Sequence, residues 1–295
     1  MRTDPRRTDK PRAEPSPTVR ALFISCSTAG RIAPPSLATG MTAIRNSDRD
    51  DSQRRIAFDG CFNFRDLGGY EAGDGRAVMP RRLYRADGPH ALTDADAVKL
   101  RGLGLVTVID LRTAQEAQER GRYLTTLGDV VEHHLPMIDV LPDTHELPEW
   151  IDPDVVARQY RNMLEHGSTA IATALVILSD PSAYPAMFHC SAGKDRTGIL
   201  AAFVLGIAGV ADDVIVDDYA LSATAMQQLI EHYQRSHPDA REQLARVAPA
   251  MVAAHPEAMA AFVEGIRSDY GSFDGLAAAI GAPDAPARIR AAILS

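Results

Sequence analysis

The feature that most constrains this chain is the ten-residue run HCSAGKDRTG at positions 189–198. Apolar residues lead into it at 186–188, and an apolar, helix-competent stretch follows it at 199–205. This pattern predicts a buried strand, a tight loop and a helix. A loop of this kind turns its backbone N–H groups inward, and the helix dipole adds partial positive charge at the same place. We therefore expect the loop to bind an anion.

The two reactive side chains of this run lie at the ends of the predicted loop. Cys190 begins the loop, and Arg196 closes it six residues later. An anion-binding environment favours the thiolate form of a cysteine, and a guanidinium group holds two phosphoryl oxygens in one plane. A thiolate beside a site for an oxyanion is what a phosphocysteine mechanism requires. The plainer alternative is a buried structural cysteine near a surface arginine, and the spacing, both glycines and the flanking segments speak against it.

The run resembles the signature H-C-x5-R-[ST] of the cysteine-dependent protein tyrosine phosphatase superfamily. It is most similar to the bacterial tyrosine/serine and phosphoinositide-active branch, in which Lys-Asp precedes the arginine. Other similar segments lie at 63–69, 108–112, 217–222 and 270–272. The resemblance implies a phosphatase of phosphomonoesters, with protein phosphotyrosine as the first substrate. Phosphoserine/threonine and phosphoinositides stay open, as does a pseudophosphatase that only binds phosphate.

Three residues are predicted to carry the catalysis. Cys190 is the nucleophile, and Arg196 binds the phosphoryl oxygens and stabilises the transition state. The leaving oxygen needs a proton, and Asp195 is the favoured general acid because it lies inside the loop. Asp139 and Asp110 follow predicted strands and are kept as alternative acids.

The other residues of the loop are predicted to bind substrate. Lys194 is a second cation, suited to substrates with more than one phosphate, and its plainer reading is a solvated loop lysine. The Thr197 hydroxyl is expected to donate to the Cys190 sulfur. Asp110 sits at the end of a neighbouring strand, where it either faces the loop or tethers its own loop. The predicted substrate-binding residues are Ser191, Ala192, Gly193, Lys194, Thr197 and Asp110.

The bulk composition restricts the partners. The chain has 295 residues, is 45% hydrophobic and carries a net charge of −8, which argues against nucleic acid. Three cysteines give no disulfide framework and suit a reducing compartment, so we expect a cytoplasmic protein, with export by a route without a signal peptide left open. We expect no stable membrane insertion, because no apolar run reaches about 18 residues. The expected partner is a phosphorylated protein or phosphoinositide, with no cofactor and no metal.

The chain divides into two parts. Residues 1–55 are predicted to be a disordered extension, since their first twenty are rich in Arg, Asp and Pro. Met41 is an alternative start within this part. Residues 56–295 are expected to form a single phosphatase domain. Its predicted fold is α/β, with a central, mostly parallel sheet flanked by helices and a helical C-terminal portion.

Several elements can be placed from local signals. Thr93 with Asp96 forms a capping-box pattern before a helix that should turn Val98 inward. Apolar runs predict strands at 105–109 and 130–138. Thr113 should cap a helix through about Tyr123. Further helices are expected from Pro153, over 168–178 and after a cap at Asp212.

Overall fold

The computed structural model describes residues 53–121, 128–139, 152–238 and 253–295. It confirms the predicted α/β architecture. A five-stranded sheet has the order β1-β2-β5-β3-β4, and all neighbouring pairs are parallel except β1 with β2. The strands are β1 (Arg65–Asp66), β2 (Leu83–Ala86), β3 (Thr107–Asp110), β4 (Val131–His134) and β5 (Ala186–His189).

The register of the parallel strands brings their carboxyl ends to one edge. Ala86 pairs with His189, and His189 pairs with Asp110. Asp110 in turn pairs with His134. In open α/β sheets, ligands bind outside this edge, and the HCSAGKDRTG loop leaves β5 there.

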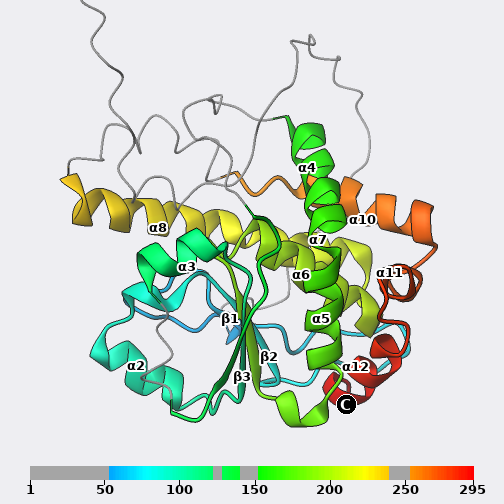
Figure 1. The fold of residues 1–295 in the computed structure, drawn as a ribbon, viewed down its shortest axis with the longest axis horizontal. Helices are drawn as coiled ribbons and strands as arrows, with labels where there is room; N and C mark the ends of the chain where they lie inside the picture. The colour runs from blue at the N-terminus through cyan, green and yellow to red at the C-terminus, as the bar shows by residue number, and fades with distance from the viewer. Residues whose placement is uncertain (1–52, 122–127, 140–151, 239–252) are drawn as a thin grey trace, which may run out of the picture.

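Helices flank the sheet on both sides. Figure 1 shows α2 and α3 on one side, α4 to α7 with α10 to α12 on the other, and α8 running across the top. The helices are α2 (Asp94–Arg101), α3 (Ala114–Arg120), α4 (Pro153–His166), α5 (Ser168–Leu178), α6 (Asp195–Ala208), α7 (Asp212–Ala220), α8 (Ser222–Ser236), α10 (Pro256–Tyr270), α11 (Phe273–Ala279) and α12 (Ala285–Ile293), with short 3-10 turns η2 (Pro89–Ala91) and η5 (Pro181–Ala183). The C-terminal portion is helical, as predicted.

Each face of the sheet buries its own core. Ile109 and Phe188 belong to the large core under α4, α5 and α6. Val108 and Met187, their neighbours along the chain, belong to a smaller core with residues around α2. Alternate residues of a strand point to opposite faces, and continuous apolar runs such as 186–188 are therefore what a sheet covered on both faces requires.

Most of the predicted elements are confirmed, and three details are wrong. The capping box of Thr93 and Asp96 is present, but Val98 is 63% exposed, because Ala97 and Leu100 take the buried face of α2. The strand predicted at 130–138 is only β4, since Pro136 follows with no N–H for a ladder. Asp212 is the first residue of α7, not its cap, which is Ala211.

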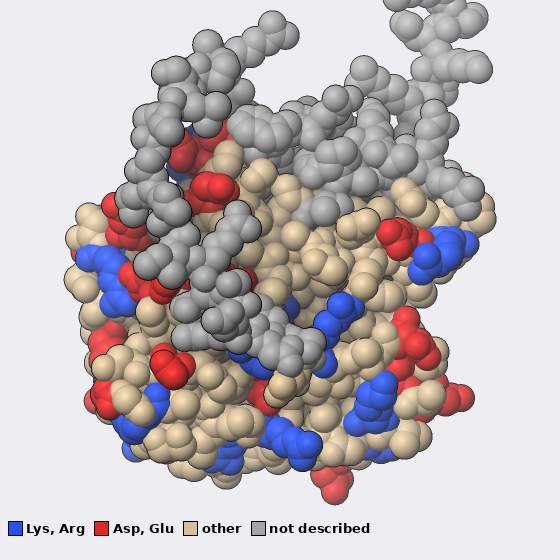
Figure 2. All heavy atoms as spheres, turned by 180° about the vertical axis from the view of Figure 1, so that it is seen from behind, with Lys and Arg blue, Asp and Glu red and all other residues tan. Residues whose placement is uncertain are grey.

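Some predictions fall outside the described residues. These are the disordered extension up to residue 52 and most of the loop from Asp139 to Pro153. The helix expected through about Tyr123 ends earlier, at Arg120, where Gly121 is its C-cap with a φ of +74°. Within the described residues, no helix combines the length and apolar character needed to span a membrane. Figure 2 shows basic and acidic side chains interspersed over the described part of the face it presents.

A glycine in α6 makes room for α11. A Cβ built on Gly206 would lie 2.1 Å from Cδ2 of Phe273. We therefore predict that Gly206→Ala lowers the free energy of unfolding by about 1–3 kcal/mol, although alanine normally favours a helix over glycine by roughly 1 kcal/mol. Denaturant unfolding measures the change. In a Gly206→Ala/Phe273→Leu double variant the two costs should not add, and strict additivity would contradict the close packing.

Candidate active site

The loop between β5 and α6 lies at the carboxyl edge of the sheet. β5 ends at His189 and α6 begins at Asp195, so Cys190 to Lys194 form the turn between them. Cys190 is only 1% exposed. The predicted strand, loop and helix are thus present, and the nucleophile candidate sits at the base of the loop.

The carbonyl groups of this loop accept hydrogen bonds from residues on the outer side of the loop. Asn63 Nδ2 donates to the Ala192 carbonyl at 3.0 Å, and the Gly88 N–H donates to the Ser191 carbonyl at 3.0 Å. Arg85 Nη2 donates to the Gly193 carbonyl at 2.8 Å and to that of Lys194 at 3.4 Å. In a trans peptide the N–H points opposite to the C=O. The N–H groups of residues 192–195 are therefore turned to the inside of the loop, where an anion can accept from them.

Gly193 meets two requirements of this turn. Its φ is +67°, a region that residues with a side chain rarely adopt. A Cβ at this position would also lie 2.5 Å from the Ala86 carbonyl oxygen at the end of β2. Both the backbone conformation and the close approach of β2 therefore require glycine here.

A buried carboxylate fixes the arginine that holds the loop. Asp218 of α7 accepts from Arg85 Nη1 at 2.6 Å and from Arg65 Nε at 2.9 Å. Burial opposes its ionisation, but Arg65 and Arg85 hold the pKa of Asp218 well below its usual range. Burial and the neighbouring Arg65 lower the pKa of Arg85 to about 10, which leaves it charged at neutral pH.

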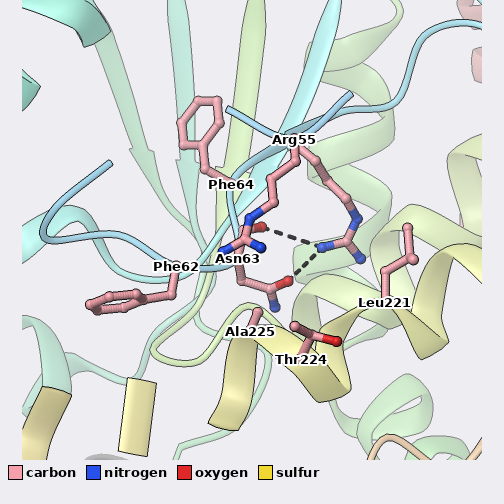
Figure 3. A pocket seen from close by; sticks show the side chains of 8 residues that line it. Arg55, Phe62, Asn63, Phe64, Leu221, Thr224 and Ala225 are labelled. Atoms are coloured by element: carbon pink, nitrogen blue, oxygen red, sulfur yellow. Dashed lines mark hydrogen bonds between the residues drawn. The ribbon is translucent and has the colours of Figure 1, made fainter. Parts of the chain in front are cut away.

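Asn63 connects the loop to a neighbouring pocket. Arg65 Nη1 donates to both the carbonyl and the side-chain oxygen of Asn63, which orients the amide so that its Nδ2 faces Ala192. Asn63 lines a pocket of about 240 Å³ together with Phe62 and Phe64, and Figure 3 shows its side chain near the centre of the view. Side chains at the start of α8 form the opposite wall, among them Leu221, Thr224 and Ala225.

Arg196 is fully buried and bound end-on by Glu116 of α3. Its Nη1 donates to Glu116 Oε2 at 2.6 Å and to the Leu111 carbonyl at 3.3 Å, and its Nη2 donates to Glu116 Oε1 at 2.9 Å. A guanidinium has five N–H groups. The Nε–H, which has no partner among the described residues, and one Nη2–H remain on the same edge of the plane. That edge can take two oxygens of a phosphoryl group.

Sequence reasoning missed Glu116, although a signal for it exists. Thr113 and Glu116 form a capping box, with Thr113 N donating to Glu116 Oε2 at 2.8 Å and Glu116 N donating to Thr113 Oγ1 at 3.1 Å. Glu116 also accepts from the Ser191 hydroxyl. Burial opposes ionisation, but Arg196 and these hydrogen bonds lower the pKa of Glu116 to about 2. Glu116 is thus ionised, and its carboxylate group orients the guanidinium of Arg196.

Asp195 lies at the first turn of α6 and is 8% exposed. Its Oδ1 accepts from the Tyr160 hydroxyl of α4 at 2.5 Å. Of the alternative acids, Asp139 is exposed and lies next to the segment 140–151, outside the described residues.

Asp110 acts as a tether in this structure. Its two oxygens accept from Arg112 Nε and Nη2, at distances from 2.7 to 3.1 Å, and the Arg112 N–H donates to Oδ1 at 3.0 Å. Burial raises the pKa of Asp110, but nearby His189 and this two-pronged bond hold it well below the usual range. The carboxylate is fully buried. Of the two roles left open, the geometry favours the loop tether over contact with substrate.

The remaining predicted residues are placed as follows. Lys194 Nζ donates to the Ala253 carbonyl at 3.2 Å and lies 3.9 Å from Asp195 Oδ1, with its side chain 11% exposed, so it is not a solvated loop lysine. Thr197 Oγ1 is buried and has no hydrogen-bond partner among the described residues, so the bond expected from this hydroxyl to the Cys190 sulfur is not formed in this structure. His189 Nδ1 lies 3.2 Å from the Cys190 carbonyl oxygen. The described residues contain no group of three or more His, Cys, Asp or Glu side chains arranged to hold a metal.

Comparisons with known proteins point to one family. A profile described as the tyrosine phosphatase family matches residues 56–295. A Cupriavidus necator protein that carries the provisional name of a tyrosine-protein phosphatase is 32% identical, over 73% of this chain and 75% of that protein. The triple specificity protein phosphatase PtpB of Mycobacterium tuberculosis is 30% identical, over 73% of this chain and 90% of that protein.

A solved structure gives a weaker likeness. TpbA of P. aeruginosa is 17% identical, with 70% of this chain and 89% of that chain covered, and its TM-score of 0.27 is too low to carry an argument. The family match extends from before β1 to the last residue of α12 and beyond, and so includes the whole sheet and the loop. It confirms the prediction of a phosphatase made from the loop. Because of this match and the similarity to the Cupriavidus necator protein and to PtpB, the chain belongs to the tyrosine phosphatase family.

Proposed function

We propose that this phosphatase hydrolyses phosphomonoesters through a phosphocysteine on Cys190, with protein phosphotyrosine as its first substrate. The Cys190 thiolate attacks phosphorus, an S–P bond forms, and the P–O bond to the leaving group breaks while Asp195 gives that oxygen its proton. Water then attacks phosphorus and gives a proton to Asp195. The S–P bond breaks, and phosphate and the thiolate are restored.

One edge of the Arg196 guanidinium is the observation that carries this proposal, because its Nε–H has no partner in the part of the chain that the structure describes. Glu116 occupies one end of the guanidinium, so the edge formed by Nε and Nη2 is left for oxygens of the phosphoryl group. The inward N–H groups of residues 192–195 supply further donors around the same anion. As charge builds on the phosphoryl oxygens, donors that are already in place stabilise the transition state without reorganisation.

Asp195 is supported as the general acid by its position. It is the first residue of α6 and directly precedes Arg196, which is proposed to bind the phosphoryl group, so its carboxyl group lies close in sequence to the proposed site of the phosphate ester. Asp110 is occupied by Arg112, which weakens the case for it. Asp139, which follows β4, remains the alternative acid.

A relative and Lys194 support a range of substrates wider than phosphotyrosine. The name of PtpB gives that protein three specificities, and for this chain it supports activity toward phosphoserine/threonine besides phosphotyrosine. Lys194, held beside Asp195, adds a second cation to the rim of the loop. A phosphoinositide is the alternative substrate, and a panel of phosphopeptides and phosphoinositides decides between the two.

Cys190→Ser should abolish turnover and keep phosphate binding. A hydroxyl is far less ionised than a thiol, while the loop shape does not depend on the sulfur. Activity is measured with para-nitrophenyl phosphate, and binding by calorimetry with inorganic phosphate. Cys61→Ser is the control, because this thiol is bound to Asp87 outside the loop. A tenth of normal activity in Cys190→Ser would rule out the phosphocysteine.

Asp195→Asn should reveal the acid through its dependence on the leaving group. We expect kcat/KM to fall about 100-fold for phenyl phosphate, whose leaving group needs a proton, and much less for para-nitrophenyl phosphate. Asp139→Asn is the matched control and should lower both rates equally, if at all. If the dependence on the leaving group appears in Asp139→Asn instead, the acid lies on the other loop.

Glu116→Gln should destabilise the protein in a way that depends on pH. The pKa of Glu116 is lowered from 4.5 to about 2 in the folded state. Its contribution is therefore fully present above about pH 5, is roughly 3 kcal/mol, and is lost as the pH falls toward 2. Denaturant unfolding of both proteins at pH 7 and pH 3 measures the difference, which should shrink at the lower pH. Glu119→Gln, on the exposed side of the same helix, should show no such change.

A further inference from the structure

The hydroxyl groups of two buried tyrosines form a chain of hydrogen bonds that ends at Asp195. The Tyr219 hydroxyl of α7 lies 2.6 Å from that of Tyr160 of α4, and the Tyr160 hydroxyl donates to Asp195 Oδ1 at 2.5 Å. Tyr160 is 0% exposed and Tyr219 is 1% exposed. Side chains from α4, α6 and α7 are thus joined in one chain of hydrogen bonds that ends at the carboxyl group of Asp195.

The direction of both hydrogen bonds follows from a count of protons. Burial and the nearby charge of Asp195 raise the pKa of Tyr160 and of Tyr219, so both hydroxyls keep their protons. Each hydroxyl has one proton to donate. A carboxylate is the stronger acceptor, so the proton of Tyr160 goes to Asp195, and Tyr219 donates to the oxygen of Tyr160.

The hydroxyls are not needed to fill space. The Tyr160 ring packs edge-on against Phe262, with centroids 5.9 Å apart, and against Tyr219, with centroids 6.0 Å apart. Phenylalanine at either position would keep these ring contacts. What the hydroxyls add is a donor that faces a single oxygen of Asp195.

We infer that Tyr160 is a positioning residue that determines which oxygen of Asp195 carries the catalytic proton. Because Oδ1 already accepts a hydrogen bond from Tyr160, a proton on Asp195 resides on Oδ2. Oδ2 is then the atom that hands the proton to the leaving oxygen and takes one back from water. Tyr219 supports this arrangement by holding the Tyr160 hydroxyl. The inference rests on the proposed role of Asp195 as the general acid.

Tyr160→Phe tests the inference through the leaving group. We expect kcat/KM for phenyl phosphate to fall about ten-fold, which is a part of the roughly 100-fold loss expected when the acid itself is removed. For para-nitrophenyl phosphate we expect kcat/KM to fall less than about two-fold. Tyr219→Phe should shift the ratio of the two rates in the same direction by a smaller factor. Equal losses for both substrates in these variants, or no loss, would overturn the inference, since a purely structural role does not distinguish leaving groups.

Two further variants complete the test. Tyr184→Phe is the matched control, because its buried hydroxyl also donates a bond of 2.5 Å, to the Leu178 carbonyl, away from the loop. It should change the melting temperature and leave the ratio of the two rates unchanged. In an Asp195→Asn background, Tyr160→Phe should have no further effect on that ratio, and a further shift would overturn the inference.

The outcomes separate this inference from the proposed function. If Asp195→Asn changes the ratio and neither tyrosine variant does, Asp195 is the acid and the positioning role is wrong. If Asp195→Asn leaves the ratio unchanged, the assignment of the acid is wrong, and the inference falls with it. A melting temperature for every variant identifies a loss that comes from unfolding, and Tyr219→Phe keeps the test open if Tyr160→Phe does not fold.

Discussion

The site depends on the hydrogen bonds made to the outward-facing carbonyl groups of the loop between β5 and α6. Carbonyl groups that turn outward have to be paired, and side chains from β2 and the segment before β1 meet them, chiefly Arg85 and Asn63. Arg85 is itself fixed by Asp218, a buried carboxylate between two arginines. Breaking such a pair leaves a buried charge without compensation, which costs about 3–5 kcal/mol. The inward N–H groups are available to an anion because the carbonyl groups of the same peptides are held by hydrogen bonds on the outer side of the loop.

Local patterns in the sequence were enough for the loop and for most of the elements around it. Cys190, Asp195 and Arg196 lie within ten consecutive residues, and a continuous apolar run on either side marks the strand and the helix. Sequence reasoning failed where a local pattern was compatible with more than one set of buried residues. Val98 fitted an apolar helix position, but the buried stripe of α2 runs through Ala97 and Leu100 instead.

The side chains that complete the site were out of reach for a different reason. Glu116 reaches Arg196 across 80 positions of sequence, and Tyr160 reaches Asp195 across 35. Each has a sufficient local explanation, since Glu116 completes a capping box and Tyr160 lies on the apolar face of an amphipathic helix. Only the packing of the helices on the sheet shows that each side chain has a second partner. Sequence reasoning therefore found the loop residues that are proposed to meet the substrate and missed the side chains that orient Arg196 and Asp195.

The pairing of Arg196 with Glu116 also bears on how the reaction ends. The carboxylate already balances the charge of the guanidinium, so the oxyanion site is built from dipoles and directed N–H groups more than from net positive charge. Such a site holds an anion by shape and hydrogen bonding, and its attraction for a free dianion at long range is weak. In the proposed mechanism, inorganic phosphate released from sulfur therefore leaves a site with little excess charge to retain it, and we expect inhibition by the product to be weak.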